Sequence, residues 1–197
     1  MAVQTMATAH LETNTGLDNR KLLMWLFLGS ECLFFGSFIS AYLLYRDRSV
    51  TGPYAKDLYD IPFTSVSSFI LLMSSLSMVL ALAAVQRGDI RGMRIWLLAT
   101  SVLGMLFLGG QAFEFTEFYR EGLTLHTNMF GTTFFVLTGF HGAHVTVGVL
   151  ILMSLFSASF KGKIKQEDSL TVELAGLYWH FVDIVWIIIF TLVYLVQ

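Results

Sequence analysis

Five long apolar runs dominate the chain, and short polar segments separate them. A helix needs about 20 apolar residues to cross a hydrocarbon layer about 30 Å thick, because its backbone N–H and C=O groups must be paired internally there. All five runs reach that length, so the pattern predicts an all-α membrane protein, a bundle of five transmembrane helices. The expected spans are residues 22–45, 63–85, 95–118, 129–160 and 177–196.

Turn-forming and charged residues mark the ends of these runs. Gly88, between Arg87 and Asp89, marks the second connection, and Gly162, between Lys161 and Lys163, follows the fourth run. Residues 1–20 form a polar, Thr-rich tail without the apolar segment of a signal peptide, and no connection is long enough to be a separate domain. We therefore expect a tail, 1–20, followed by one transmembrane domain, 21–197.

The distribution of Lys and Arg predicts the orientation, because short loops rich in these residues stay on the cytoplasmic side. With five spans, one side carries twice as many of the 12 basic residues as the other. That side holds Arg20, Lys21, Arg87, Arg91, Arg94, Lys161, Lys163 and Lys165. The N-terminus is thus predicted inside and the C-terminus outside, with Trp25 and Trp96 at the inner membrane boundary.

Composition narrows the class further. Hydrophobic residues make up 55% of the chain and charged residues 13%, and the mean hydropathy is +0.68, which excludes an ordinary soluble domain. A net charge of -2 without a basic stripe gives no support for a nucleic-acid partner. The single cysteine, Cys32, has no partner for an internal disulfide and fits no zinc-ligand spacing.

Glu31 is the first ionisable residue inside a span. It stands about 15 Å along the first predicted helix at 1.5 Å per residue, near the membrane midplane. A charge at that depth costs a few kcal/mol, so the residue needs a partner, a cavity or a function. Two interpretations stay open: a carboxyl group that exchanges protons or orients a neighbouring subunit, and a neutral acid that only fixes helix packing.

Four further polar residues lie in the last two spans. His141 and His144 stand three apart on one helix face, which can hold a metal, but a metal or haem site needs ligands that five histidines at mismatched depths do not supply. We expect histidines hydrogen-bonded across helices and no metal site. His180 is expected near the inner surface, and Asp183 is expected to pair with it, to contact a partner helix or to relay protons.

Charged residues near the ends of spans have simpler explanations. Glu114 is expected at the outer membrane boundary, where it reaches water or a neighbouring arginine. Arg87, Arg91 and Arg94 form a basic loop that sets the orientation and contacts lipid headgroups.

Three motifs carry a resemblance to a known family. They are WLFLGSECLFF at 25–35, GTTFF with TGFHGAHV across 131–145, and YWHFVDIVW at 178–186. Together they resemble the third subunit of haem-copper oxidases, cytochrome c oxidase subunit III, in its five-helix bacterial form. The first motif is similar to the family's helix with a carbodiimide-reactive carboxylate, a role that falls on Glu31. The two-helix start of longer members is missing, so no specific lipid ligands carry over.

The resemblance implies an accessory subunit with no catalytic residue and no redox centre of its own. Its partners would be oxidase subunits I and II, which hold the haem and copper, a small subunit IV, and bound phospholipid. It would stabilise the catalytic subunit and support proton uptake while oxygen is reduced to water, in a bacterial plasma membrane rather than a mitochondrial one. The 138–141 turn is more similar to cytochrome c oxidases than to quinol oxidases.

Two alternatives belong to another class. A stand-alone transporter would use Glu31, His141, His144 and Asp183 as its polar path, but internal repeats and helices interrupted by glycine or proline are not evident. A haem-binding membrane protein would show the haem absorption band in the isolated chain.

Overall fold

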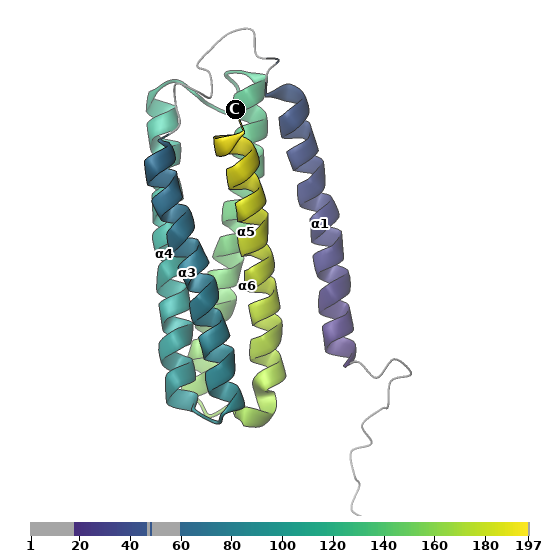
Figure 1. The fold of residues 1–197 in the computed structure, drawn as a ribbon, viewed down its shortest axis with the longest axis vertical. Coiled ribbons are helices and arrows are strands. Elements are labelled where there is room, and N and C mark those ends of the chain that lie inside the picture. The colour runs from purple at the N-terminus through teal and green to yellow at the C-terminus, as the bar shows by residue number, and fades with distance from the viewer. Residues whose placement is uncertain (1–17, 47, 49–59, 197) are drawn as a thin grey trace, which may run out of the picture.

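The computed structural model describes residues 18–46, 48 and 60–196, so residues 1–17 of the expected tail lie outside the described part. Within it, five helices are long and apolar enough to cross a membrane (Figure 1). They are α1 (Asn19–Tyr45), α3 (Ile61–Gln86), α4 (Ile90–Arg120), α5 (Met129–Phe160) and α6 (Ser169–Phe190), the last flanked by the 3-10 turn Gln166–Asp168 and the π-helical turn Thr191–Leu195.

Side-chain caps explain where four of the helices begin. The carboxylates of Asp18, Asp60 and Asp89 accept backbone N–H groups at the starts of α1, α3 and α4, and the Asn128 side chain does the same for α5. Each cap satisfies a donor that has no partner within its own helix. Gly88 follows α3 with a φ of 78°, a conformation that disfavours other residues, and so reverses the chain into α4.

Two helices begin well before the apolar spans predicted for them. The fourth span agrees at both ends, whereas α4 starts at Ile90 rather than residue 95. The last helix starts at Ser169 rather than residue 177. Hydropathy marks only the part of a helix that lies in hydrocarbon, and a helix continues beyond it until a cap or turn ends it.

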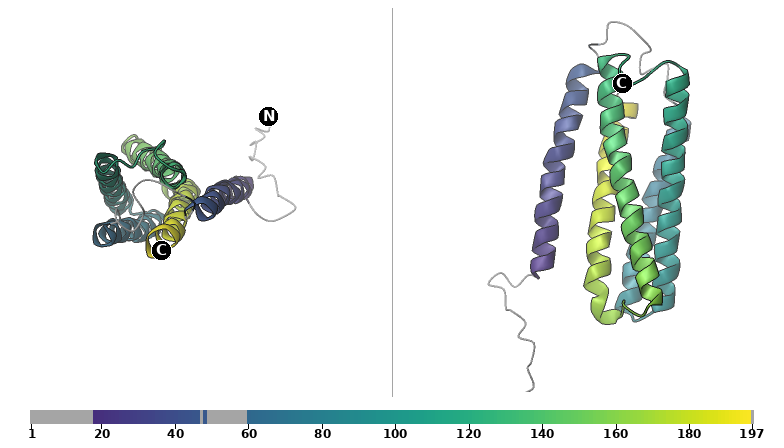
Figure 2. Two further views of the ribbon diagram at one scale, coloured as in Figure 1. Left: turned by 90° about the horizontal axis from the view of Figure 1, so that it is seen from above. Right: turned by 180° about the vertical axis from the view of Figure 1, so that it is seen from behind.

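Helices α3, α4, α5 and α6 form a compact bundle, and α1 stands at its side (Figure 2). The bundle buries a large share of each of its four helices, but α1 buries only Leu28, Phe35 and Tyr42, which are seven residues apart and so share one face. This face lies against α5 and α6. Most of the surface of α1 is therefore open to lipid or to a partner chain.

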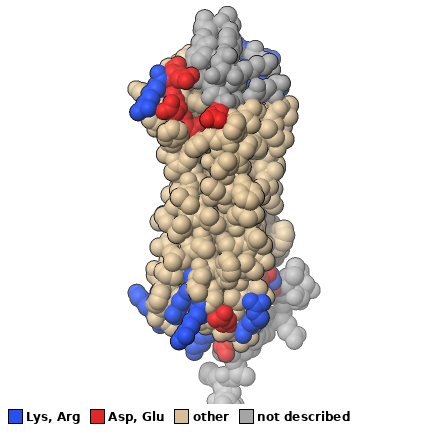
Figure 3. All heavy atoms as spheres, turned by 60° about the vertical axis from the view of Figure 1, so that its left-hand side comes forward, with Lys and Arg blue, Asp and Glu red and all other residues tan. Residues whose placement is uncertain are grey.

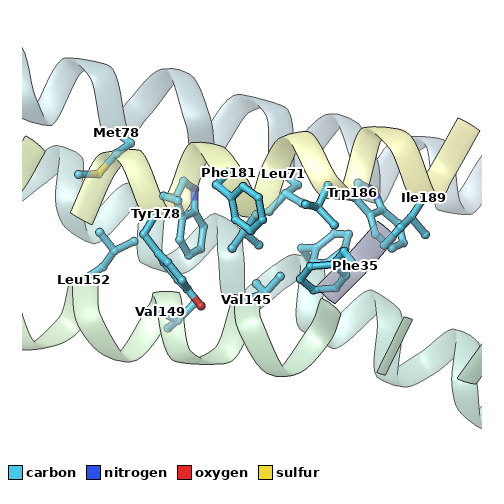
Figure 4. Close-up of a cluster of buried hydrophobic side chains, with 14 of the residues drawn as sticks. Phe35, Leu71, Met78, Val145, Val149, Leu152, Tyr178, Phe181, Trp186 and Ile189 are labelled. Atoms are coloured by element: carbon cyan, nitrogen blue, oxygen red, sulfur yellow. The ribbon is translucent and has the colours of Figure 1, made fainter. Parts of the chain in front are cut away.

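The core of the bundle combines aromatic and aliphatic side chains (Figure 4). Hydrogen bonds from two tryptophans to serines cross it. Trp179 Nε1 donates to Ser74 Oγ at 3.0 Å, and Trp186 Nε1 donates to Ser68 Oγ at 2.8 Å. Both serines are on α3 and both tryptophans on α6, so the two bonds set the register of these antiparallel helices. Serine on α3 also lets the bulky rings of α6 approach closely.

Charged side chains gather at the two ends of the molecule, and the surface between them carries few charges (Figure 3). On the face shown, most Lys and Arg residues lie at the lower end, while the upper end carries an acidic cluster. An apolar belt between charged ends is the surface expected of a membrane-spanning bundle.

Candidate functional site

The described residues place a carboxyl–imidazole pair between α1 and α5. Glu31 Oε2 lies 3.2 Å from His144 Nε2, and the two side chains are 17% and 19% exposed. Both residues stand close to the middle of their helices, Asn19–Tyr45 and Met129–Phe160, and the depth near the membrane midplane expected for Glu31 stays a prediction. A carboxyl group at that depth is stabilised by a nearby hydrogen-bonding partner, and His144 supplies it.

The hydrogen bonds of His144 determine how many protons this pair holds. His144 Nδ1 lies 2.8 Å from the carbonyl oxygen of Phe140, and because a carbonyl only accepts, Nδ1 must carry a proton. A hydrogen bond between Nε2 and Glu31 requires one further proton. This proton resides on the imidazole, which gives an ion pair, or on the carboxyl group, which gives a neutral hydrogen bond. The Glu31–His144 pair can therefore pass one proton between its two members.

Aromatic rings and an apolar cleft surround the pair. The ring of Phe35 packs at 4.9 Å from His144, and Tyr178 Oη donates to the His144 carbonyl oxygen at 3.1 Å. A cleft of about 590 Å³ extends from His144 between α1, α5 and α6, and its lining includes Met24, Phe27, Val147 and Leu155. Sequence reasoning did not single out Tyr178, whose position only the packing of α6 against α5 reveals.

His141 is placed differently from His144, although both contact Phe35. The His141 ring is fully buried, stacks on Trp186 at 5.0 Å and meets the edge of Phe107 at 5.9 Å. Neither ring nitrogen has a hydrogen-bond partner among the described residues. The two histidines thus diverge rather than face one ligand, and the described residues contain no group of three or more His, Cys, Asp or Glu placed to hold a metal ion.

His180 is not near the inner surface, which corrects the expectation from the sequence. It stands at the middle of the continuous helical segment Gln166–Leu195, because α6 begins earlier than its hydropathy indicated. Its Nδ1 lies 2.6 Å from Ser75 Oγ on α3, and no His180–Asp183 hydrogen bond forms among the described residues. Asp183 is buried beside the same serine, and within the described residues its Oδ1 has no hydrogen-bond partner.

Glu114 also departs from its expected position. Only 7% of it is exposed, and Thr64 Oγ1 donates to Glu114 Oε1 at 2.8 Å, with Tyr194 close by. The expected contact with water or a neighbouring arginine is wrong, because the rotation of α4 about its axis turns this side chain toward α3 and α6. Its depth at the membrane boundary stays a prediction. Glu117, which stands one helical turn away, is the residue that pairs with Arg120, at 3.0 Å.

Of the three arginines in the basic loop, Arg87 and Arg91 are exposed as expected for headgroup contact. Arg94 instead caps α5: its Nε donates to Ser159 Oγ at 2.9 Å and its Nη2 to the Ser159 carbonyl oxygen at 2.5 Å. A cation is stabilised at this end of a helix by the partial negative charge of the last carbonyls. Its expected contact with lipid headgroups stays a prediction, since the side chain is half-exposed.

The two boundary tryptophans lie on the outer surface. Trp25 is 61% exposed and Trp96 is 37% exposed. Their rings are open to lipid headgroups, and their assignment to the membrane boundary stays a prediction.

Comparison with known proteins identifies the family. The model of the family described as cytochrome c oxidase subunit III matches residues 3–197. The chain is 38% identical over 186 residues to cytochrome c oxidase subunit 3 of Bacillus sp. (strain PS3), with 93% of this chain and 90% of that protein covered. It is 41% identical over 181 residues to the Synechocystis sp. protein of the same name, covering 90% and 76%. It is also 35% identical over 189 residues to quinol oxidase subunit 3 of Bacillus subtilis, covering 96% and 92%. This multi-pass membrane chain therefore belongs to the cytochrome c oxidase subunit III family.

Proposed function

We propose that this chain is the accessory third subunit of a respiratory haem-copper oxidase in a bacterial plasma membrane. The match to the subunit III family over residues 3–197 carries the proposal. Subunits I and II, with a small subunit IV, are the proposed partners, and the haem and copper that reduce oxygen reside in them. The chain stabilises the catalytic subunit, and its N-terminus faces the cytoplasm because the more basic end lies there.

The Glu31–His144 pair is proposed to support proton uptake. Two observations favour this over a purely structural role: Nε2 and Oε2 lie within hydrogen-bonding reach at 3.2 Å, and both side chains remain partly exposed near the cleft. A proton held between two groups in a low-dielectric setting moves with little rearrangement of the helices.

The electron donor is proposed to be cytochrome c. The 138–141 turn favours it, and relatives named as cytochrome c oxidase subunits from several bacteria match the chain. A quinol oxidase is the second candidate, since relatives with that name match over a similar share of the chain.

The cleft beside His144 is proposed to hold the acyl chain of a phospholipid. Its lining is almost entirely apolar, and an adjoining hollow of about 580 Å³ reaches Arg20 at the inner end of α1. A guanidinium at the mouth of an apolar groove suits a phosphate headgroup.

The test is to purify the complex through a tag on this chain and to record its reduced-minus-oxidised spectrum, its oxygen uptake with cytochrome c or quinol, and its loss of activity during turnover. Copurified haem and oxidase activity would support the subunit assignment. A chain that purifies alone and without oxidase activity would refute it.

Two variants separate proton transfer from packing at Glu31. Glu31→Gln keeps a side chain of the same size that donates to His144 Nε2 but cannot exchange a proton, whereas Glu31→Ala removes both properties. We expect both variants to lose activity faster during turnover than the native complex. If Glu31→Gln behaves like the native protein and only Glu31→Ala is impaired, the carboxyl group serves packing alone.

A further inference from the structure

Polar contacts tie α1 to the bundle at its inner end as well as at its middle. At the inner end Lys21 Nζ lies 2.6 Å from Glu173 Oε1 at the start of α6, and these side chains are 33% and 31% exposed. The Glu31–His144 pair follows ten residues later, about 15 Å along the helix at 1.5 Å per residue. Both contacts therefore lie on one rigid element, and the position of its inner end bears on the geometry at its middle.

The inner end of α1 is loosely packed against the bundle. Two hollows, of about 590 and 580 Å³, adjoin this part of the helix, and both linings include Met24, Phe27 and Leu174. Phe27 is 42% exposed, and its ring stands 6.3 Å from that of Tyr178. The first buried residue of α1 is Leu28. An ion pair at the end of such a segment therefore has a large share in setting the distance between α1 and α6.

A change in the tilt of α1 would move Glu31 relative to His144. The helix can tilt about Leu28 or Phe35, the buried residues on either side of Glu31. At 1.5 Å per residue, moving the inner end away from α6 by about 3 Å would shift the backbone at Glu31 by about 1 Å for either pivot. Glu31 Oε2 and His144 Nε2 lie 3.2 Å apart, so a shift of that size takes them beyond hydrogen-bonding distance.

We propose that Lys21 and Glu173 are positioning residues for the Glu31–His144 pair, because their ion pair sets the tilt of α1 that keeps Oε2 within reach of Nε2. The inference rests on the proposed function, since it concerns how the same proton-exchanging pair is held. Partly exposed ion pairs contribute little to overall stability. Loss of this one should therefore change the geometry at Glu31 more than the amount of folded chain.

Charge reversal in the whole complex tests the proposal. Lys21→Glu and Glu173→Lys each place two like charges at the inner end of α1, and the double variant restores opposite charges in reverse order. We expect each single variant to lose activity during turnover several-fold faster than the native complex, and the double variant to recover most of the difference. Lys163→Glu, at an exposed lysine of the same basic side, controls for the change of charge and should behave like the native complex.

An infrared measurement reports on the geometry of the pair. The band of the Glu31 carboxyl group, assigned by its loss in Glu31→Gln, should shift in both single variants and return in the double variant. An unshifted band in the single variants, or a double variant no better than the single ones, would overturn the positioning role. If Glu31→Gln itself keeps native activity during turnover, proton uptake at this pair is refuted, whereas the infrared band still decides whether the ion pair positions Glu31. The two failures are thus distinguishable.

Discussion

The most direct test of the core is to add a methyl group on either side of Trp179. A Cβ at Gly104 on α4 would lie 2.6 Å from Trp179 Cη2, and one at Gly148 on α5 would lie 2.8 Å from Cε3 of the same ring. The ring has little freedom to move aside, because its Nε1 is bonded to Ser74 at 3.0 Å and the side chain is only 1% exposed. The indole thus fills a space that the two glycines keep open.

The expected loss of stability can be worked out from a matched pair of variants on one helix. Gly104→Ala and Gly109→Ala gain the same intrinsic helix propensity, about 1 kcal/mol, but a Cβ at Gly109 meets nothing within 4 Å. Overpacking a rigid core costs about 1–3 kcal/mol. We therefore expect Gly104→Ala to be less stable than Gly109→Ala by about 2 kcal/mol, within that overpacking range.

The assay heats the purified complex in mild detergent, removes aggregates and measures the soluble tagged chain at each temperature. Gly109→Ala should match or exceed the native chain, and Gly104→Ala should be lost at lower temperature. Replacing Trp179 by Phe in the Gly104→Ala background should recover part of the loss. Equal stability of the two alanine variants would refute the placement of the indole against α4.

Two further predictions concern single polar contacts. Trp186→Phe and Ser68→Ala each remove the 2.8 Å bond between α6 and α3, so each should cost about 1 kcal/mol in the same heating assay, and the double variant should cost no more than either. Arg94→Ala removes the cap on α5 and should speed hydrogen exchange in the last turn of that helix. In Arg94→Lys the exchange rate should be intermediate, because lysine keeps the charge but loses the guanidinium geometry. Unchanged exchange in that turn would show that Arg94 does not cap the helix.

For Glu31, the sequence predicts the position along its helix but not the residue that contacts it. Its depth could be counted along the first helix, because a helix advances by a fixed rise per residue. The identity of its neighbour could not be counted in this way. His144 approaches it only because α1 lies against α5, and nothing in the spacing between residues 31 and 144 encodes that contact.

The surroundings predicted for Glu114 and His180 from the sequence differ from those in the structure for related reasons. Glu114 stands near the end of an apolar run, so an outward position was reasonable, but the rotation of α4 about its axis directs it toward Thr64. His180 stands near the start of an apolar run, yet α6 begins at Ser169, and the ring therefore lies at mid-span. Hydropathy reports how apolar a segment is, and neither the rotation of a helix nor its full length follows from that average.

The protein class, the five membrane-spanning helices and the family motifs follow from the amino-acid sequence alone. In lipid every backbone polar group must be hydrogen-bonded within a helix, so the length of an apolar run predicts a spanning helix. The contacts between polar residues are visible only in the three-dimensional structure: Glu31 contacts His144, His180 contacts Ser75, and Glu114 contacts Thr64. Each pair joins two different helices, and its two residues are at least 50 positions apart in the chain. Their contacts depend on side-chain packing between helices, which hydropathy does not record.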